Sequence, residues 1–112
     1  MERLKRPRDF GHTVSTGATY TNRWLVIFVS AVPGEPTRVG FTAARSAGTA
    51  VKRNRIRRRL RAAVAGINRP FCPGRRIVVL GKASALTAPW RDLTTGLVTL
   101  LDRARCLEGD GC

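Results

Sequence analysis

The chain has 112 residues, 43% of them hydrophobic, which fits one folded domain with a modest core and excludes extensive disorder. Its formal net charge is +14, and fourteen Lys or Arg with no acidic residue lie between Glu35 and Asp92. Self-repulsion of this size predicts a polyanionic partner, with nucleic acid favoured over an anionic membrane surface. The start, MERLKRPRDF, lacks the apolar stretch of a signal peptide, and no run reaches the length of a membrane span. We therefore expect a cytoplasmic protein without a membrane partner.

The first half of the chain predicts one helix and two strands. We expect a short helix over residues 8–16, where Phe10 and Val14 share one face. β-Branched and aromatic residues predict strands over 24–32 and 37–43. The turn PGEP joins these two strands, so we expect them to form a hairpin.

The second half predicts a helix, a strand and a final helix. Thr49 can cap a helix over residues 50–65, and Gly66 can terminate it. The run RIVVLG at 76–81 lacks polar alternation, which predicts a strand covered on both faces. The final helix should begin near Thr87, because an apolar stripe at helical spacing follows. This stripe comprises Trp90, Leu93, Leu97, Leu100, Leu101 and Ala104.

We treat residues 1–112 as a single domain whose ends, 1–7 and 107–112, are expected to be flexible. The three cysteines are Cys72, Cys106 and Cys112. Their odd number and spacing fit neither a disulfide framework nor a zinc site, so we predict reduced thiols.

Residues 51–64, VKRNRIRRRLRAAV, predict a helix with two different sides. At about 100° per residue, a polar set and an apolar set each span an arc of roughly 100°, and the two arcs are centred roughly 130° apart. The polar set is Asn54, Arg57, Arg58 and Arg61. The apolar set is Ile56, Leu60, Ala63, Val64 and Ile67. No acid offsets the charge along the polar side, so its cations repel one another unless phosphates neutralise them. Arginine also offers bidentate phosphate contacts and stacking on bases.

The acidic residues and the histidine do not predict a self-contained active site. Phosphodiester hydrolysis by a protein usually needs clustered carboxylates for Mg²⁺ or a histidine pair. This chain has one histidine, His12, and seven acids placed toward its ends. We expect Asp9 to be a helix cap and His12 a surface residue, and we predict no catalytic residue and no metal ligand in the protein.

The stretch VKRNRIRRRLRAAV resembles the signature of the protein component of bacterial ribonuclease P. The family pattern Arg-Asn-x-x-Lys-Arg-x-x-Arg falls on Arg53, Asn54, Arg57, Arg58 and Arg61. Only Arg57 departs from it, and the charge is kept. RLKRPRDF near the start, RVGFTAAR and AGTAV before the signature, and IVVLGKASA after it also resemble the family. The resemblance spans residues 3 to 105.

The resemblance implies an α+β fold in the order αβββαβα, a two-layer sandwich like the second domain of ribosomal protein S5. It implies a short strand near residues 18–21 and a left-handed crossover, which propensity does not indicate. It further implies an accessory subunit of an endoribonuclease that matures the 5′ end of tRNA. In that family the RNA subunit performs the hydrolysis with Mg²⁺, and the protein holds this RNA and the precursor tRNA.

The resemblance implies two RNA-binding surfaces. The signature helix should contact the RNA subunit through Lys52, Arg53, Asn54, Arg55, Arg57, Arg58 and Arg61. A surface between the first helix and the sheet should hold the single-stranded 5′ leader of precursor tRNA. Its expected residues are Phe10, Val26, Phe28, Thr42, Arg45 and Lys82. Val26 and Phe28 could instead belong to the core. Val14 and Ser46 stand where the family usually has an aromatic residue and a lysine, and both differences would weaken leader contacts.

Two other functions use the same basic helix. A non-catalytic RNA chaperone or ribosomal protein is the main alternative. A DNA-binding helix module is weaker, because a predicted hairpin rather than a partner helix precedes the arginine helix.

Overall fold

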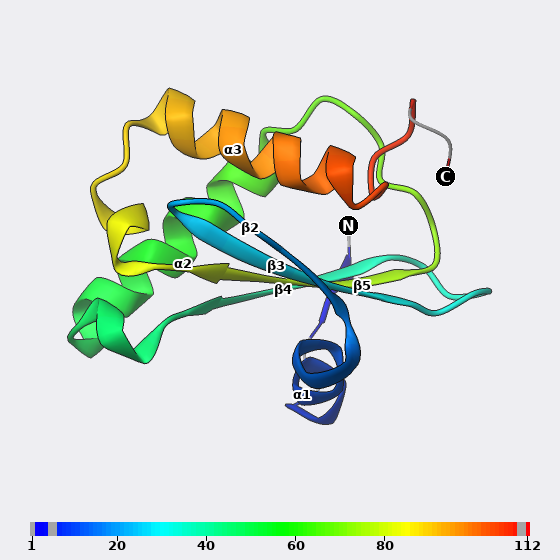
Figure 1. Ribbon diagram of the computed structural model, residues 1–112, viewed down its shortest axis with the longest axis horizontal. Helices are drawn as coiled ribbons and strands as arrows, with labels where there is room; N and C mark the ends of the chain where they lie inside the picture. Colours follow the sequence, from blue (N-terminus) through cyan, green and yellow to red (C-terminus); the bar gives the residue numbers. More distant parts are fainter. Residues whose placement is uncertain (1, 5–6, 110–111) are drawn as a thin grey trace.

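The computed structural model describes residues 2–4, 7–109 and 112. Its helices and strands form a five-stranded sheet with α2 and α3 on one face and α1 on the other (Figure 1). In chain order the elements are β1 (Glu2–Arg3), α1 (Pro7–Thr16), β2 (Ala18–Thr21), β3 (Leu25–Ala31), β4 (Arg38–Ala43), a 3₁₀ helix (Arg45–Ala47), α2 (Ala50–Ala65), β5 (Arg75–Gly81), a second 3₁₀ helix (Ala83–Leu86) and α3 (Trp90–Arg103). The α+β order αβββαβα is confirmed, and the short β1 precedes it.

The sheet has the order β1-β4-β5-β3-β2, so the predicted hairpin of β3 and β4 is wrong. β5 lies between these two strands, antiparallel to β3 and parallel to β4. Ile77, Val78 and Val79 of β5 are fully buried, which confirms that both faces of this strand are covered. A strand buried on both faces belongs in the centre of a sheet, and here it separates two strands that follow each other in sequence.

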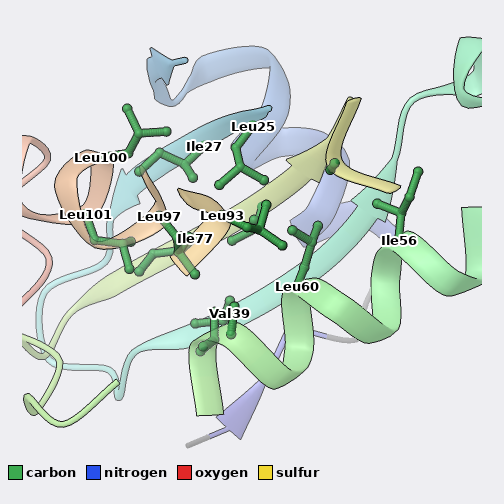
Figure 2. Close-up of a cluster of buried hydrophobic side chains, with 14 of the residues drawn as sticks. Leu25, Ile27, Val39, Ile56, Leu60, Ile77, Leu93, Leu97, Leu100 and Leu101 are labelled. Atoms are coloured by element: carbon green, nitrogen blue, oxygen red, sulfur yellow. The ribbon is translucent and has the colours of Figure 1, made fainter. Parts of the chain in front are cut away.

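The main core lies between the sheet and the layer formed by α2 and α3. Side chains from β3, β4 and β5 meet the apolar faces of both helices (Figure 2). The largest members are Leu25, Ile27, Val39, Ile56, Leu60, Ile77, Leu93, Leu97, Leu100, Leu101 and Leu107. Ile56, Leu60 and Val64 are therefore core residues, as the two-sided helix predicts.

A glycine lets α3 approach the sheet closely. A Cβ atom at Gly96 would lie 2.8 Å from Nδ2 of Asn22 and 3.2 Å from the ring of Trp24. The α3 helix begins at Trp90, later than the predicted start near Thr87, because residues 83–86 form a 3₁₀ helix and Pro89 is the N-cap. Trp90 is 47% exposed, so it is not a core member of the predicted stripe.

Both predicted flexible ends make defined contacts where the structure describes them. Glu2 and Arg3 pair with β4 in parallel, and Leu4 is buried. At the other end Leu107 is buried and forms a bridge with Phe71. The structure thus gives 2–4 and 107–109 packing partners that composition did not indicate, while the mobility of the two ends stays a prediction and 1, 5–6 and 110–111 lie outside the described residues.

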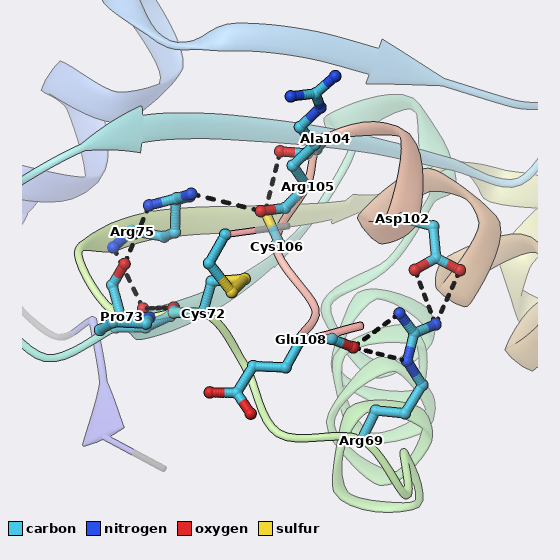
Figure 3. The surroundings of a disulfide bond; sticks show 11 residues. Arg69, Cys72, Pro73, Arg75, Asp102, Ala104, Arg105, Cys106 and Glu108 are labelled. Carbon is cyan, nitrogen blue, oxygen red and sulfur yellow. Dashed lines mark hydrogen bonds and ion pairs between the residues drawn. A yellow bond between two sulfur atoms is a disulfide. The ribbon is translucent and has the colours of Figure 1, made fainter. Parts of the chain in front are cut away.

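Cys72 and Cys112 form a disulfide, so the prediction of three reduced thiols is wrong for these two (Figure 3). Their Cα atoms lie 5.4 Å apart although 40 positions separate them in sequence. The tail reaches Cys72 because it runs along the loop before β5, where the amide of Cys72 donates to the carbonyl of Cys106. Cys106 is free, and burial raises its thiol pKa to about 11, with Arg75 opposing the rise.

Candidate nucleic-acid interface

The α2 helix begins and ends at the predicted residues, with Thr49 as its N-cap and Gly66 as its C-cap. The Oγ1 atom of Thr49 accepts a hydrogen bond from the amide of Lys52 at 3.2 Å. At the other end Gly66 is the C-cap and its amide donates to the carbonyl of Ala62. These caps satisfy backbone groups that a helix leaves without partners, and they fix the direction in which the arginines project.

The polar face of α2 carries cations that no carboxylate neutralises. Lys52, Asn54, Arg55, Arg58 and Arg61 are exposed, and Arg53 and Arg57 are half-buried. Among the described residues, none of these cations forms an ion pair with an acid. Arg57 donates to Oδ1 of Asn54 at 3.1 Å. The arrangement offers a ridge of donors suited to phosphates.

Arg59 belongs to the same basic run but has a structural role that the sequence does not indicate. Its guanidinium donates to the carbonyl of Ala85, to that of Leu86 at 3.0 Å and to that of Ala88 at 2.6 Å. It also lies 5.7 Å from the centroid of the exposed Trp90 ring. Arg59 therefore ties α2 to the segment before α3, and we exclude it from the ridge.

The predicted leader residues of the sheet lie on the face opposite to α2 and α3. Leu25 and Ile27 of β3 point into the main core, and the alternating residues Val26 and Phe28 are half-buried on the other face. They are therefore not members of the main core cluster, and their role in leader binding stays a prediction. Phe10 of α1 packs on this face against Gly40, where a Cβ atom would collide with its ring.

A strip of this face remains partly open beside α1. Across the sheet, Thr21, Val26, Leu80 and Thr42 stand in register on four adjacent strands, and each is at least partly exposed. We call these four residues the open strip. Leu80 was missed by sequence reasoning. Neighbouring residues of a strand point to opposite faces, so Leu80 lies on the face opposite to the buried Val79. The sequence predicted that both faces of this strand are covered and therefore gave no reason to single out Leu80.

Two predicted cations lie just beyond the carboxyl ends of the neighbouring strands β4 and β5. Arg45 comes just after β4 and is exposed, and Lys82 comes just after β5 and is half-buried. Because β4 and β5 are parallel, both residues lie at the same end of their strands. The ammonium of Lys82 donates to the carbonyl of Asn22, so this cation is anchored against the start of β3.

Of the two predictions for polar residues of α1, the exposure of His12 is confirmed and the capping role of Asp9 is wrong. His12 is exposed, as predicted. Asp9 lies in the first turn of α1 rather than before it, so it is not the cap, and its carboxylate pairs with Arg76 at 3.5 Å. Val14 is 38% exposed at the position where the family usually has an aromatic residue.

Within the described residues, no three His, Cys, Asp or Glu side chains gather as a metal site would require. In the same part of the chain, no helix combines the length and the apolar character needed to cross a membrane.

Comparisons with known proteins agree on one family. The model of the ribonuclease P family matches residues 1–105. The ribonuclease P protein component of Symbiobacterium thermophilum is 39% identical over 110 residues, which cover 97% of this chain and 96% of that protein. The ribonuclease P protein component of Pseudarthrobacter chlorophenolicus is 39% identical over 92 residues, which cover 81% and 68%.

Solved structures give the same result for the fold. The RNase P protein from Thermotoga maritima superposes with a TM-score of 0.76 at 25% identity and covers 92% of this chain and 97% of its own. The Staphylococcus aureus RNase P protein superposes with a TM-score of 0.77 at 22% identity and covers 96% and 99%.

Proposed function

This chain belongs to the ribonuclease P protein family and is therefore the accessory subunit of a tRNA-processing endoribonuclease that contains an RNA subunit, and on this premise we propose how it binds RNA. The α2 ridge binds the RNA subunit, and the open strip with its flanking residues binds the 5′ leader of precursor tRNA. The single observation that carries the proposal is a capped helix whose cations have no carboxylate partner among the described residues.

The α2 ridge suits a folded RNA because its donors are fixed on a rigid element. Each exposed guanidinium can contact a phosphate in a bidentate way, and each contact releases condensed counterions. The residues that we propose for this surface are Lys52, Arg53, Asn54, Arg55, Arg57, Arg58 and Arg61.

The leader surface suits a single strand because flat apolar groups stand beside cations. Phe10 and Phe28 can stack on bases, while Arg45 and Lys82 neutralise phosphates at the sheet edge. We include Val26, Thr42 and the newly found Leu80 in this surface. Stacking depends little on base identity, so sequence preference for the leader should be loose.

Hydrolysis belongs to the RNA subunit in this proposal. The described residues do not provide a cluster of three possible metal ligands, so we derive no catalytic step from the protein. We propose that Mg²⁺ acts as a cofactor of the RNA subunit. We also propose that the protein acts in the cytoplasm, where precursor tRNA is present.

A cleavage assay at low Mg²⁺ tests this function. Purified protein is added to a ribonuclease P RNA and a precursor tRNA at a Mg²⁺ concentration where the RNA alone is slow. We expect the protein to restore cleavage at the mature 5′ end, because its cations replace part of the charge screening that Mg²⁺ provides. Polylysine at matched charge is the control. Equal rescue by polylysine would favour a general RNA chaperone, and no rescue by the protein would overturn the proposal.

A further inference from the structure

An apolar groove with arginines at its rim lies beside the α2 ridge, on the sheet face that carries α2. It has a volume of about 760 Å³. Apolar residues line it, and we call Val39 and Phe41 of β4 its floor and Val64 of α2 and Phe71 of the following loop its walls. Arg3 of β1 and Arg61 of α2 also line it.

The groove combines the two chemical features of a nucleotide. Its floor and walls are aliphatic and aromatic, which suits the flat face of a base. Among the described residues no acidic side chain lines it, and arginines contribute guanidinium groups to its lining. The guanidinium of Arg61 lies 6.0 Å from the centroid of the Phe41 ring, so a cation and an aromatic face already adjoin each other.

The third lining arginine, Arg69, holds the shape of the groove. It donates to Oδ2 of Asp102 at 2.9 Å and to the carbonyl of Glu108 at 3.0 Å (Figure 3). These bonds anchor the loop that carries Phe71 to α3 and to the C-terminal segment. The wall of the groove is therefore fixed from two sides.

We propose that this groove binds one unpaired nucleotide of the RNA subunit, with the base against Phe41 and Phe71 and the phosphate on Arg61 and Arg3. This inference rests on the proposed function and extends it to a base-binding pocket. The RNA subunit is favoured over the leader because the groove adjoins Arg61 of the α2 ridge, whereas the open strip lies on the opposite face of the sheet.

Charge also favours RNA over a protein occupant. A second copy of this chain carries the same net charge of +14 and would bring further cations to an arginine rim. An anionic chain with unstacked bases meets both the rim and the floor.

Two tryptophan variants on one helix test the groove. Ala65 is exposed and lines the groove, so Ala65→Trp should fill it without entering the core. Ala62 is exposed on the same helix, four positions after Arg58, and does not line the groove, so Ala62→Trp adds the same bulk beside the α2 ridge and is the matched control. We expect Ala65→Trp to bind ribonuclease P RNA about tenfold more weakly than Ala62→Trp, the order expected for one lost base stack. Equal melting temperatures of both variants and the parent would show that they fold alike.

Photo-crosslinking identifies the occupant in the complete complex. Benzoylphenylalanine replaces Pro70, which is exposed and lines the groove. We expect a crosslink to a single unpaired nucleotide of the RNA subunit. A crosslink to the leader or to a second protein copy, or none at all, would overturn the inference. So would equal RNA affinity of the two tryptophan variants. If Arg58→Ala weakens RNA binding while Ala65→Trp does not, only the groove assignment fails; if neither does, the proposed function fails as well.

Discussion

Arg58 and Arg59 are neighbours in sequence with opposite expected roles, and alanine at each position separates RNA binding from folding. Arg58 is exposed on the α2 ridge. Arg59 donates three hydrogen bonds to backbone carbonyls of residues 85–88. Both substitutions remove the same charge from the same turn of the helix, so any difference between them reflects what each side chain contacts.

The magnitude for Arg59 follows from its three bonds. A hydrogen bond to a charged group contributes roughly 1.5–3 kcal/mol, and bonds that share one guanidinium are not additive. Arg59 is half-buried, so we expect Arg59→Ala to lower the free energy of unfolding by about 2–4 kcal/mol. At about 4 °C per kcal/mol for a domain near this size, the melting temperature should fall by roughly 8–16 °C.

The magnitude for Arg58 appears in RNA binding instead. An exposed substitution usually changes stability by less than about 0.5 kcal/mol. If Arg58 contacts one phosphate, Arg58→Ala should reduce the slope of log K against log salt by about 0.7–0.9. Affinity for the RNA subunit should fall correspondingly at low salt.

Thermal melts and RNA binding at several salt concentrations measure both quantities on the same preparations. A lower melting temperature for Arg58→Ala, or an unchanged one for Arg59→Ala, would refute the division of roles. An unchanged salt slope for Arg58→Ala would count against α2 as the surface that binds RNA.

Three further substitutions test other parts of the structure. Phe28→Ala should weaken binding of precursor tRNA about tenfold more than that of mature tRNA, because one base stack contributes roughly 1–3 kcal/mol; equal losses in filter binding would assign the ring to packing. Gly96→Ala should lower the free energy of unfolding by about 1 kcal/mol in urea titrations, since overpacking against Asn22 and Trp24 exceeds the helix propensity gained; a stabilised variant would contradict this close contact. Cys112→Ser should lower the free energy of unfolding by about 4 kcal/mol relative to the oxidised parent, because the disulfide closes a long loop. The variant should be as stable as the reduced parent. Equal stability of variant and parent without reductant would mean that the bond does not form.

Local signals in the sequence were sufficient to predict α2. Thr49 and Gly66 act on backbone groups within four positions of themselves, so a single sequence contains the information that sets both ends. The spacing of Ile56 and Leu60 likewise determines which side of the helix is buried. The exposed cations of the ridge follow from the same periodicity.

Pairing between distant segments could not be predicted in this way. The hairpin expectation failed because β5, which follows α2, inserts between β3 and β4. The partners of the tail could not be predicted for a similar reason, since the bridge between Phe71 and Leu107 joins segments far apart in sequence. Composition at either end of the chain does not indicate these partners, and only the three-dimensional path supplies them.

The same limit applies to single arginines. Arg59 and Arg58 have the same residue type and nearly the same neighbours in sequence, yet the carbonyls that distinguish them lie some 26 to 29 positions away. Family resemblance could place the ridge, but it assigned no role to Arg59 and did not indicate Leu80.

The distribution of acidic residues explains how the protein keeps a strong positive charge on one surface and still folds. Asp9 pairs with Arg76, and Glu35 also approaches Arg76 at 3.6 Å. Asp102 pairs with Arg69 at 2.7 Å. These acids lie near arginines that join elements of the fold, and none of them reaches the α2 ridge within the described residues.

Acidic side chains therefore neutralise some arginines of the fold and leave the cations of the α2 ridge without a carboxylate partner among the described residues. Arg59, Arg69 and Arg76 connect elements of the fold and have carboxylates or carbonyls as partners, so we expect them to contribute little to RNA binding. Among the described residues the cations of the α2 ridge lack carboxylate partners, so we expect their repulsion to be relieved when a polyanion binds. It follows that the salt dependence of binding to the RNA subunit should reflect the cations of the α2 ridge and of the groove rim, and should fall well short of the slope that all 21 Lys and Arg would give.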